Sequence, residues 1–187
     1  MSALLKLTVP EYDLMVESGA FDRLDRRIEL IYGDLRAMNP AGPIHDDFIG
    51  FLTHWSIENT SRQRILVRIQ SGLSLPEQDS RPEPDILWVK PRRYLDGHPR
   101  SQDALLLIEV SRSSIQYNRV LKSGLYSKAR IREFWVVDVE DRCIIVHREP
   151  SDEGYSEVNS FGLGDTISPT IEPAALLKLS SLFEADV

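Results

Sequence analysis

The sequence predicts an α/β fold built around one mixed β-sheet. Two continuous apolar runs, residues 85–89 and 104–110, are typical of strands that are buried on both faces of a sheet. An amphipathic segment long enough for a helix follows the second run. Along the chain the patterns occur in the order helix, hairpin, helix, strands, helix, strands, which predicts an α/β or α+β sandwich around one mixed sheet.

The N-terminal third is expected to form a helix, a hairpin and a second helix. Thr8 and Glu11 have the Thr-x-x-Glu spacing of a capping box, which predicts that a helix begins there. Residues 26–39 contain two short apolar strands that flank Gly33-Asp34, a turn signal. Residues 42–60 show helical spacing of apolar residues. The residues expected on its apolar face are Ile44, Phe48, Phe51, Leu52 and Trp55.

The middle of the chain is expected to supply the rest of the core. Residues 64–75 alternate as a strand, whereas residues 76–84 contain prolines, which cannot donate to a sheet ladder, and predict a loop. Residues 90–103 are polar and predict a second loop between the two apolar runs. Residues 111–131 predict a helix, and residues 132–149 predict a closing hairpin.

The C-terminal tail is expected to be mostly irregular. Gly162 and Gly164 indicate turns, and residues 174–179 predict a short helix. Length and pattern together predict one domain over residues 1–187. Its expected parts are an N-terminal helix-hairpin-helix part (1–60), a core (61–150) and an acidic C-terminal part (151–187).

Composition limits the class of protein. With 42% hydrophobic and 27% charged residues, the chain is typical of a soluble globular protein. A single cysteine, Cys143, excludes an intramolecular disulfide and a cysteine-rich zinc site. No apolar stretch is long enough for a transmembrane helix, and the apolar run at the N-terminus is too short for a signal peptide. We therefore expect a cytoplasmic protein with no membrane partner.

The negative charge is concentrated at one end of the chain. Residues 138–187 hold eleven acidic residues against three Lys or Arg, so residues 1–137 carry about +1 of the total of −7. Residues 100–132 hold seven basic residues and two acidic ones. This excess predicts a local basic surface suited to a nucleic acid, with ordinary solvated surface charge as the alternative.

Two acids at the ends of the apolar runs are the strongest indication of chemistry. Asp85 begins the first run, and Glu109 is the second-to-last residue of the second. A charge in such a place is costly unless it is paired, protonated or bound to a metal. If the two strands are neighbours and the acids share an end, a divalent cation would remove the repulsion between them. Oxygen ligands favour Mg²⁺ or Mn²⁺.

Lys122 lies on the helix predicted after the Glu109 strand. Asn118, Lys122 and Tyr126 are spaced i, i+4, i+8, so they share one helix face. From there Lys122 can extend along the sheet to the carboxylates. Its charge could then orient a water molecule or stabilise negative charge on a phosphate.

Each of these residues also has a purely structural alternative. Asp85 can cap a turn after Pro84, Glu109 can pair with Arg112, and Lys122 can be a solvated helix lysine. Other site types have less support, since the sequence has no Walker loop, GxSxG elbow, HExxH motif or dinucleotide fingerprint.

These residues give the sequence a resemblance to the PD-(D/E)xK nuclease superfamily, and within it to the Uma-two family of restriction-endonuclease-like proteins. The resemblance rests on Pro84-Asp85 followed by "LLLIEV" with Glu109, and on further strings in the same order over most of the chain. These strings are "TVPEYDLM", "RRIELIYGDL", "GPIHDDFIGFL", "VRIQSGLSL" and "EPDILWVKPRRYLDGHP", with "LLLIEVSRSSIQYNRVLKSGLYSKARIREFWVVD" at the end. The resemblance implies an α/β fold with a restriction-endonuclease-like core. In this α/β/α core, a mixed central sheet is flanked by helices.

The resemblance also implies an activity and a set of site residues. The activity is metal-dependent hydrolysis of phosphodiester bonds in DNA, with Mg²⁺ or Mn²⁺ as cofactor. Asp85, Glu109 and Lys122 would be catalytic, Asp85 and Glu109 would hold the metal, and Glu29 would be a third carboxylate near it. The supporting or substrate-binding residues would be His45, Gln70, Asn118, Arg119 and Tyr126.

Structural alternatives exist for three of these residues. Glu29 could form a cross-strand ion pair with Arg27, His45 could be a local hydrogen-bond partner, and Gln70 could satisfy a sheet edge. His54 follows His45 by nine residues, which places the two on opposite sides of a helix, so they cannot share one metal.

Two positions depart from the family pattern. The lysine of the (D/E)xK motif would fall at Ser111, so the resemblance implies that Lys122 takes its place. Asn118 stands where relatives often carry an aspartate. The prediction is an endonuclease acting on DNA as a homodimer, since cutting both strands needs two sites. The alternatives are a catalytically degenerate nucleic-acid- or protein-binding domain of the same fold, or a hydrolase of another phosphoester.

Overall fold

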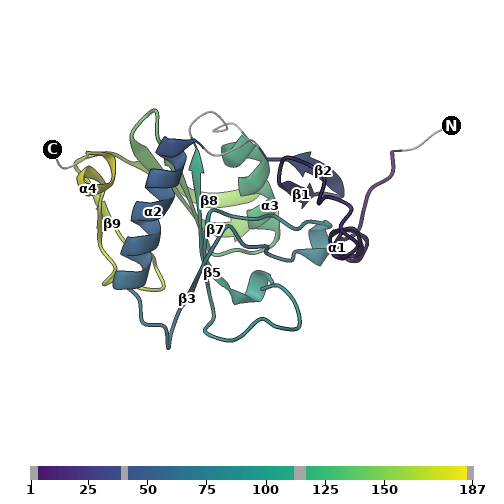
Figure 1. Ribbon diagram of the computed structural model, residues 1–187. Coiled ribbons are helices and arrows are strands. Elements are labelled where there is room, and N and C mark those ends of the chain that lie inside the picture. The colour runs from purple at the N-terminus through teal and green to yellow at the C-terminus, as the bar shows by residue number, and fades with distance from the viewer. Residues whose placement is uncertain (1–3, 39–41, 112–116, 185–187) are drawn as a thin grey trace.

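The computed structural model describes residues 4–38, 42–111 and 117–184, and its centre is a six-stranded mixed sheet (Figure 1). Strands that are neighbours in the sequence are neighbours in this sheet, in the order β3-β4-β5-β6-β7-β8. β5 and β6 pair in parallel, because a helical segment carries the chain back between them, and the other neighbours pair antiparallel. The strands are β3 (Leu66–Ile69), β4 (Ile86–Val89), β5 (Ala104–Ser111), β6 (Glu133–Asp138), β7 (Cys143–Ser151) and β8 (Gly154–Phe161).

Helices cover both faces of the sheet, so the predicted mixed sheet flanked by helices is confirmed (Figure 1). One face packs against α2, α4 and a small two-stranded sheet, and the other face packs against η3 and α3. The elements of the first face are α2 (Pro43–Glu58), β9 (Thr166–Ile167), β10 (Leu177–Lys178) and α4 (Leu179–Phe183). Those of the second are η3 (Tyr117–Lys122), a π-helical segment, and α3 (Ser123–Lys128).

Aromatic rings anchor the helices to the sheet. On the α2 face, the Trp55 ring stacks on those of Trp88 and Trp135, with ring centroids 5.5 and 5.9 Å apart. On the other face, the rings of Tyr126 and Phe134 meet edge to face at 4.9 Å. Each such pair contributes about 0.5–1.5 kcal/mol beyond the burial of its apolar area. The two helical layers are therefore fixed against the strands whose ends carry Asp85 and Glu109.

The N-terminal part forms a separate small unit at one end of the sheet (Figure 1). The predicted capping box is confirmed at α1 (Val9–Glu17), where the backbone N–H of Thr8 donates to Glu11 at 2.8 Å. β1 (Ile28–Ile31) and β2 (Asp34–Ala37) then form the predicted hairpin.

The hairpin turn lies one residue earlier than the sequence suggested. Its two central residues are Tyr32 and Gly33, with φ of 51° and 78°, whereas Asp34 already pairs with Ile31. Positive φ at both positions matches the right-handed twist of two-residue hairpins. The hairpin packs on residues 76–84, the predicted loop, which contains η1 (Pro76–Gln78). There the Gly33 N–H donates to the Asp79 carbonyl at 2.8 Å, so the turn also sets where β1 lies relative to the sheet.

Replacing Gly33 by alanine is expected to lower the free energy of unfolding by about 1–2 kcal/mol. The residue needs positive φ, and a Cβ there would lie 2.8 Å from Lys6 Cβ. Gly124→Ala is the matched control, since a Cβ at this helical position meets nothing within 4 Å and should stabilise by about 0.5–1 kcal/mol. Urea unfolding of both variants checks this, and equal shifts of the same sign would contradict it.

The inward face of α2 differs from the prediction. Ile44 and Phe51 are 43% and 37% exposed, although both were expected on the apolar face. The buried residues of α2 are Ile49, Leu52, Trp55 and Ser56. This stripe shares Leu52 and Trp55 with the expected one but is rotated by about 65°, and His45, four residues before Ile49, lies on the side that faces the sheet.

The C-terminal tail is more regular than predicted. Residues 154–161 form edge strand β8, which the sequence did not mark because its side chains are mostly solvent-exposed and polar. The helix predicted over residues 174–179 is wrong, because Leu177 and Lys178 pair with β9 and α4 begins at Leu179. Pairing buries Leu177 in the core, and this packing overrides the local helix pattern.

η1 and η2 (Ser101–Asp103) are short 3₁₀ turns, and η2 leads directly into β5. Among the helices described here, none is both long and apolar enough to cross a membrane.

Candidate active site

Asp85 and Glu109 meet at one end of the sheet, as their positions in the sequence suggested. β4 and β5 run antiparallel with Ile86 opposite Ile108, so the start of one strand lies beside the end of the other. The backbone N–H of Val110 donates to Asp85 Oδ2 at 2.8 Å, which holds the Asp85 carboxylate against the Glu109 backbone. Both acids are buried, with 4% and 3% of their surfaces exposed. The Asp85 carboxylate therefore bridges two strands.

Lys122 reaches the same end of the sheet from η3. It is 2% exposed, which excludes the alternative of a solvated lysine. Its Nζ lies 2.8 Å from Glu109 Oε1 and 3.0 Å from Glu29 Oε1. The Tyr126 hydroxyl, one turn further along, donates to the same Glu109 oxygen at 2.9 Å. Lys122 from η3 and Tyr126 from α3 thus meet at one oxygen of Glu109, and Lys122 links that oxygen to Glu29.

Glu29 comes from the hairpin and is held by the loop before β4. The Glu83 N–H donates to Glu29 Oε1 at 2.8 Å, and the Glu83 carboxylate forms an ion pair with Arg27. Arg27 also donates to the Gln70 carbonyl at 3.0 Å. Glu29 therefore pairs with Lys122 rather than with Arg27, and its expected role as a third metal ligand stays a prediction.

The Arg27–Glu83 pair was not predicted from the sequence. Glu83 lies between two prolines, and that segment was interpreted as loop alone. The signal that could have found it is its position two residues before Asp85, on a segment that the prolines hold extended. Together the two side chains fix the hairpin to the loop that leads into β4.

His45 contacts the Asp85 carboxylate from the first turn of α2. Its Nε2 lies 3.3 Å from Asp85 Oδ2. The hydrogen bond to Asp85 raises the pKa of His45 above its ordinary value, and burial opposes this only in part. His54 is exposed on the other side of α2 and pairs with Glu58 at 3.1 Å, as the helical geometry predicted.

The remaining predicted residues have different outcomes. Gln70 lies beside the site, and its backbone N–H donates to the Asp85 carbonyl at 3.0 Å from a left-handed conformation with φ of 44°. Within the described part of the chain, its side chain makes no hydrogen bond. Asn118 and Arg119 belong to η3, but their side chains lie outside the described residues, as does all of Arg112.

The electrostatics of the cluster are dominated by burial and by its surplus of carboxylates. Burial raises the pKa of Glu109 to about 7, and Asp85 and Glu29 add to this while Lys122 opposes it. Burial lowers the pKa of Lys122, but Glu109 and Glu29 together outweigh burial and raise it above its ordinary value. Lys122 therefore stays charged at neutral pH, where it pairs with both Glu109 and Glu29.

The donor set fits a divalent cation at Asp85 and Glu109. Each carboxylate bonds to the protein through one oxygen, and Asp85 Oδ1 and Glu109 Oε2 accept no hydrogen bond from the described residues. Mg²⁺ is commonly bound by one or two carboxylates, with water and substrate phosphate as the other ligands. In the described ranges, no group of three or more His, Cys, Asp or Glu is arranged to hold a metal, so the fit is limited to the two carboxylates of Asp85 and Glu109.

Comparisons with known proteins agree with this geometry. A crystal structure of "a putative nuclease belonging to DUF820 from Anabaena variabilis ATCC 29413" has the same fold, with a TM-score of 0.74. The two share 14% sequence identity over 95% of this chain and 97% of that one. No curated protein matches the chain. The sequence profile of the Uma2 family, described as "Putative restriction endonuclease", matches residues 9–179. The chain thus belongs to the Uma2 family of restriction-endonuclease-like nucleases.

Proposed function

We propose that this chain is a metal-dependent endonuclease that hydrolyses phosphodiester bonds in DNA. The observation that carries the proposal is the junction of Asp85, Glu109 and Lys122 at the shared end of β4 and β5. Family membership supports nuclease chemistry in general. The oxygen donors at this junction support the metal dependence, and the positive charge of Lys122 supports DNA as the substrate.

Asp85 and Glu109 would hold Mg²⁺ or Mn²⁺ through Asp85 Oδ1 and Glu109 Oε2, which accept no hydrogen bond from the part of the chain that the structure describes. Such an ion, when bound, lowers the pKa of a water molecule and neutralises charge on the phosphate. The Val110 N–H and His45 fix one oxygen of Asp85. This leaves its carboxylate pre-oriented, which reduces the reorganisation needed during the reaction.

Lys122 would act through its charge rather than as a base. Because its pKa is raised, it keeps its proton at neutral pH and cannot accept one from water. Its ammonium group lies against Glu109 Oε1, where it can stabilise negative charge that develops on the phosphate. Tyr126 holds the same oxygen and thereby directs the other oxygen of Glu109 away from the helix.

Cleavage assays test the proposal directly. Supercoiled plasmid and single-stranded DNA are incubated with Mg²⁺, Mn²⁺ or a chelator, beside Asp85→Asn, Glu109→Gln and Lys122→Met. We expect cleavage only with a metal, and a loss of at least about 10²-fold in each variant. Glu133→Gln is the matched control, because Glu133 is an equally buried acid (2% exposed) at the opposite end of the sheet, where it pairs with Arg148. Cleavage that survives both carboxylate substitutions would overturn the assignment.

Binding without cleavage is the second candidate, and one observation favours it. Lys122 already neutralises part of the carboxylate cluster, which lowers its attraction for a cation. DNA binding by the wild-type chain with no metal-dependent cleavage would select this candidate. The homodimer expected for double-strand cleavage stays a prediction, which sedimentation of the chain with and without DNA can check.

A further inference from the structure

Arg68 lies on the face of the sheet that carries the site. It pairs with Leu87 on β4, and Leu87 pairs with Leu107 on β5, so the three side chains share one face. Glu109 is two residues from Leu107 and therefore points to the same side. By strand geometry, Arg68 is displaced from Glu109 by about 10 Å across the sheet and about 7 Å along it. The total is about 12 Å, which corresponds to roughly three to four nucleotides at an axial rise of about 3.4 Å per nucleotide in one strand of duplex DNA.

The charge of Arg68 has no acidic partner among the described residues. Its guanidinium lies over the Tyr94 ring, 5.6 Å from the centroid, and takes part in no ion pair there. Its Nε is buried without a hydrogen-bond partner. The two terminal nitrogens also lack partners but are not buried, so they face solvent. Arg68 is thus a cation held in place by an aromatic ring, with free donors directed outward.

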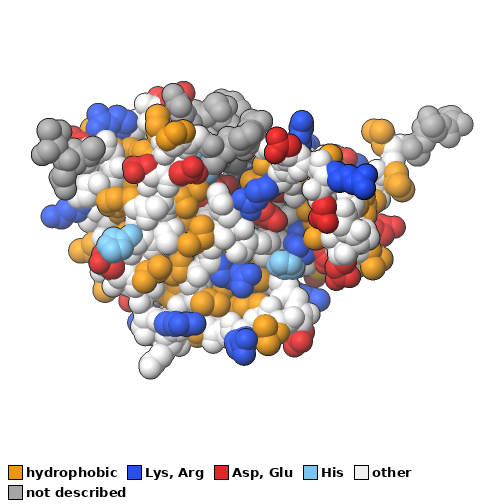
Figure 2. All heavy atoms as spheres, viewed as in Figure 1, with side chains coloured by type: hydrophobic (Ala, Val, Ile, Leu, Met, Phe, Trp, Pro, Cys, Tyr) orange, Lys and Arg blue, Asp and Glu red, His pale blue; other side chains and the backbone are white. Residues whose placement is uncertain are grey.

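Arg92 also contacts the Tyr94 ring. Its guanidinium lies 4.7 Å from the Tyr94 centroid and is held by Asp103 at 2.8 Å. Figure 2 shows Lys and Arg side chains across the lower middle of this face, over β3 and the segment after β4. The exposed basic residues of that segment are Lys90, Arg92, Arg93 and Arg100.

The basic surface predicted over residues 100–132 is divided by the fold. Lys122 is buried in the site, and Arg130 is paired with Asp152 at 2.8 Å. Arg100 is the exposed member that lies near Arg92, on the segment that packs against Asp103. The cationic surface nearest the site is therefore built by β3 and residues 90–100, upstream of the segment that the sequence indicated.

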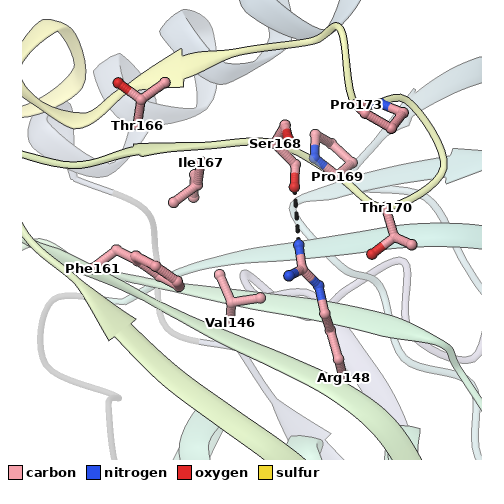
Figure 3. Close-up of a pocket in the computed structure, with 9 residues that line it drawn as sticks. All are labelled: Val146, Arg148, Phe161, Thr166, Ile167, Ser168, Pro169, Thr170 and Pro173. Atoms are coloured by element: carbon pink, nitrogen blue, oxygen red, sulfur yellow. Dashed lines mark hydrogen bonds between the residues drawn. The ribbon is translucent and has the colours of Figure 1, made fainter.

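A pocket elsewhere offers a contrast to this surface. A cavity of about 340 Å³ lies between β7, β8 and residues 166–173, with Arg148 on its wall (Figure 3). Arg148 donates to the Ser168 carbonyl at 2.9 Å and to the buried Glu133 at 2.8 Å. Its charge is already neutralised there, so this pocket is not suited to a phosphate group.

We propose that Arg68, held against Tyr94, forms the surface that binds the DNA strand near the site, with Arg68 contacting a phosphate a few nucleotides from the reacting one. The proposal rests on the proposed function, because it assumes that a polynucleotide is the substrate. A strand laid from Glu109 toward β3 meets the outward donors of Arg68. The planar guanidinium suits two oxygens of one phosphate.

Salt-dependent binding tests the proposal without needing cleavage. Fluorescein-labelled DNA of about 20 nucleotides, single-stranded and duplex, is titrated with the chain in chelator over a range of salt concentrations, and anisotropy is recorded. For Arg68→Gln we expect about tenfold weaker binding and a slope of log affinity against log salt that is smaller by about one. Arg68→Lys should restore the slope. Arg130→Gln is the matched control and should bind as the wild type does.

The outcomes separate this proposal from the proposed function. If Arg68→Gln binds DNA with unchanged affinity and slope, the surface is refuted, even where the wild-type chain cleaves DNA. If binding depends on Arg68 but no metal supports cleavage, the surface stands and the endonuclease assignment fails. If Arg68→Gln and Arg68→Lys lose affinity equally with no change in slope, Arg68 is only a packing residue and the surface is refuted.

Discussion

Lys122→Met is expected to lower the free energy of unfolding by about 3–5 kcal/mol. Methionine fills a similar volume but leaves Glu109 and Glu29 buried without their shared cation. An uncompensated buried charge is far more costly than the loss of one exposed ion pair, which is about 0–1 kcal/mol. Chemical denaturation at neutral pH, without divalent metal, measures the effect.

Lys128→Met is the matched control for this prediction. Lys128 lies in α3, the helix that follows Lys122, but it is exposed, and its contact is with the Tyr32 ring at 5.7 Å. Its substitution should change stability by less than about 1 kcal/mol. Adding Glu109→Gln to Lys122→Met should recover part of the loss, because one buried charge is removed. A loss no larger than that of the control would show that Lys122 is not the counter-charge of the cluster.

Without a divalent metal, the chain is expected to lose stability as the pH rises from about 5 to 8. Glu109 has a folded-state pKa of about 7, above its ordinary value of 4.5. A raised pKa means that the folded state binds the proton more tightly, so this contribution is complete below pH 4.5 and is lost as the pH passes 7. The expected loss is on the order of 1–3 kcal/mol.

The Glu109→Gln variant separates the contribution of Glu109 to this pH dependence from the contributions of other groups. His45 acts in the same direction, since its pKa is also raised and its contribution is lost as it deprotonates. The variant keeps the His45 contribution and removes that of Glu109, so its unfolding free energy should depend less on pH. It should also be relatively more stable than the wild type at pH 8 than at pH 5. Identical pH profiles of the unfolding free energy for the two proteins would mean that Glu109 does not change its protonation state in this range.

Much of the fold could be predicted because its signals are local. The Thr8–Glu11 capping box acts within one helical turn, and the two apolar runs mark strands by composition alone. β8 and β10 escaped prediction for the opposite reason. β8 is an edge strand with exposed polar side chains, and β10 is extended only because β9 lies beside it. No periodicity within either segment records those neighbours.

The site was partly predictable because some of its signals are also local. Asp85 and Glu109 were noticeable as charges in apolar runs, Lys122 followed from its place on the next predicted helix, and the resemblance supplied Glu29 and His45 as further members. The inward rotation of α2, which turns His45 toward Asp85, was missed because Ile44 and Phe51 misled the estimate of its apolar face. The Arg27–Glu83 pair joins residues 56 positions apart, which the sequence pattern does not reveal.

By itself, the sequence determined which residues carry unusual charge and where the buried strands β4 and β5 and the helix α1 lie. It did so because propensity and periodicity are properties of neighbouring residues. The tertiary structure alone decided that β4 and β5 run antiparallel side by side, which brings Asp85 to the backbone of Glu109. It also decided that Lys122 is buried between two carboxylates and that Arg68, on the same face of the sheet, has no acidic partner among the described residues. Desolvation depends on every element packed around a group, so only the assembled fold sets the charge and pKa of this site.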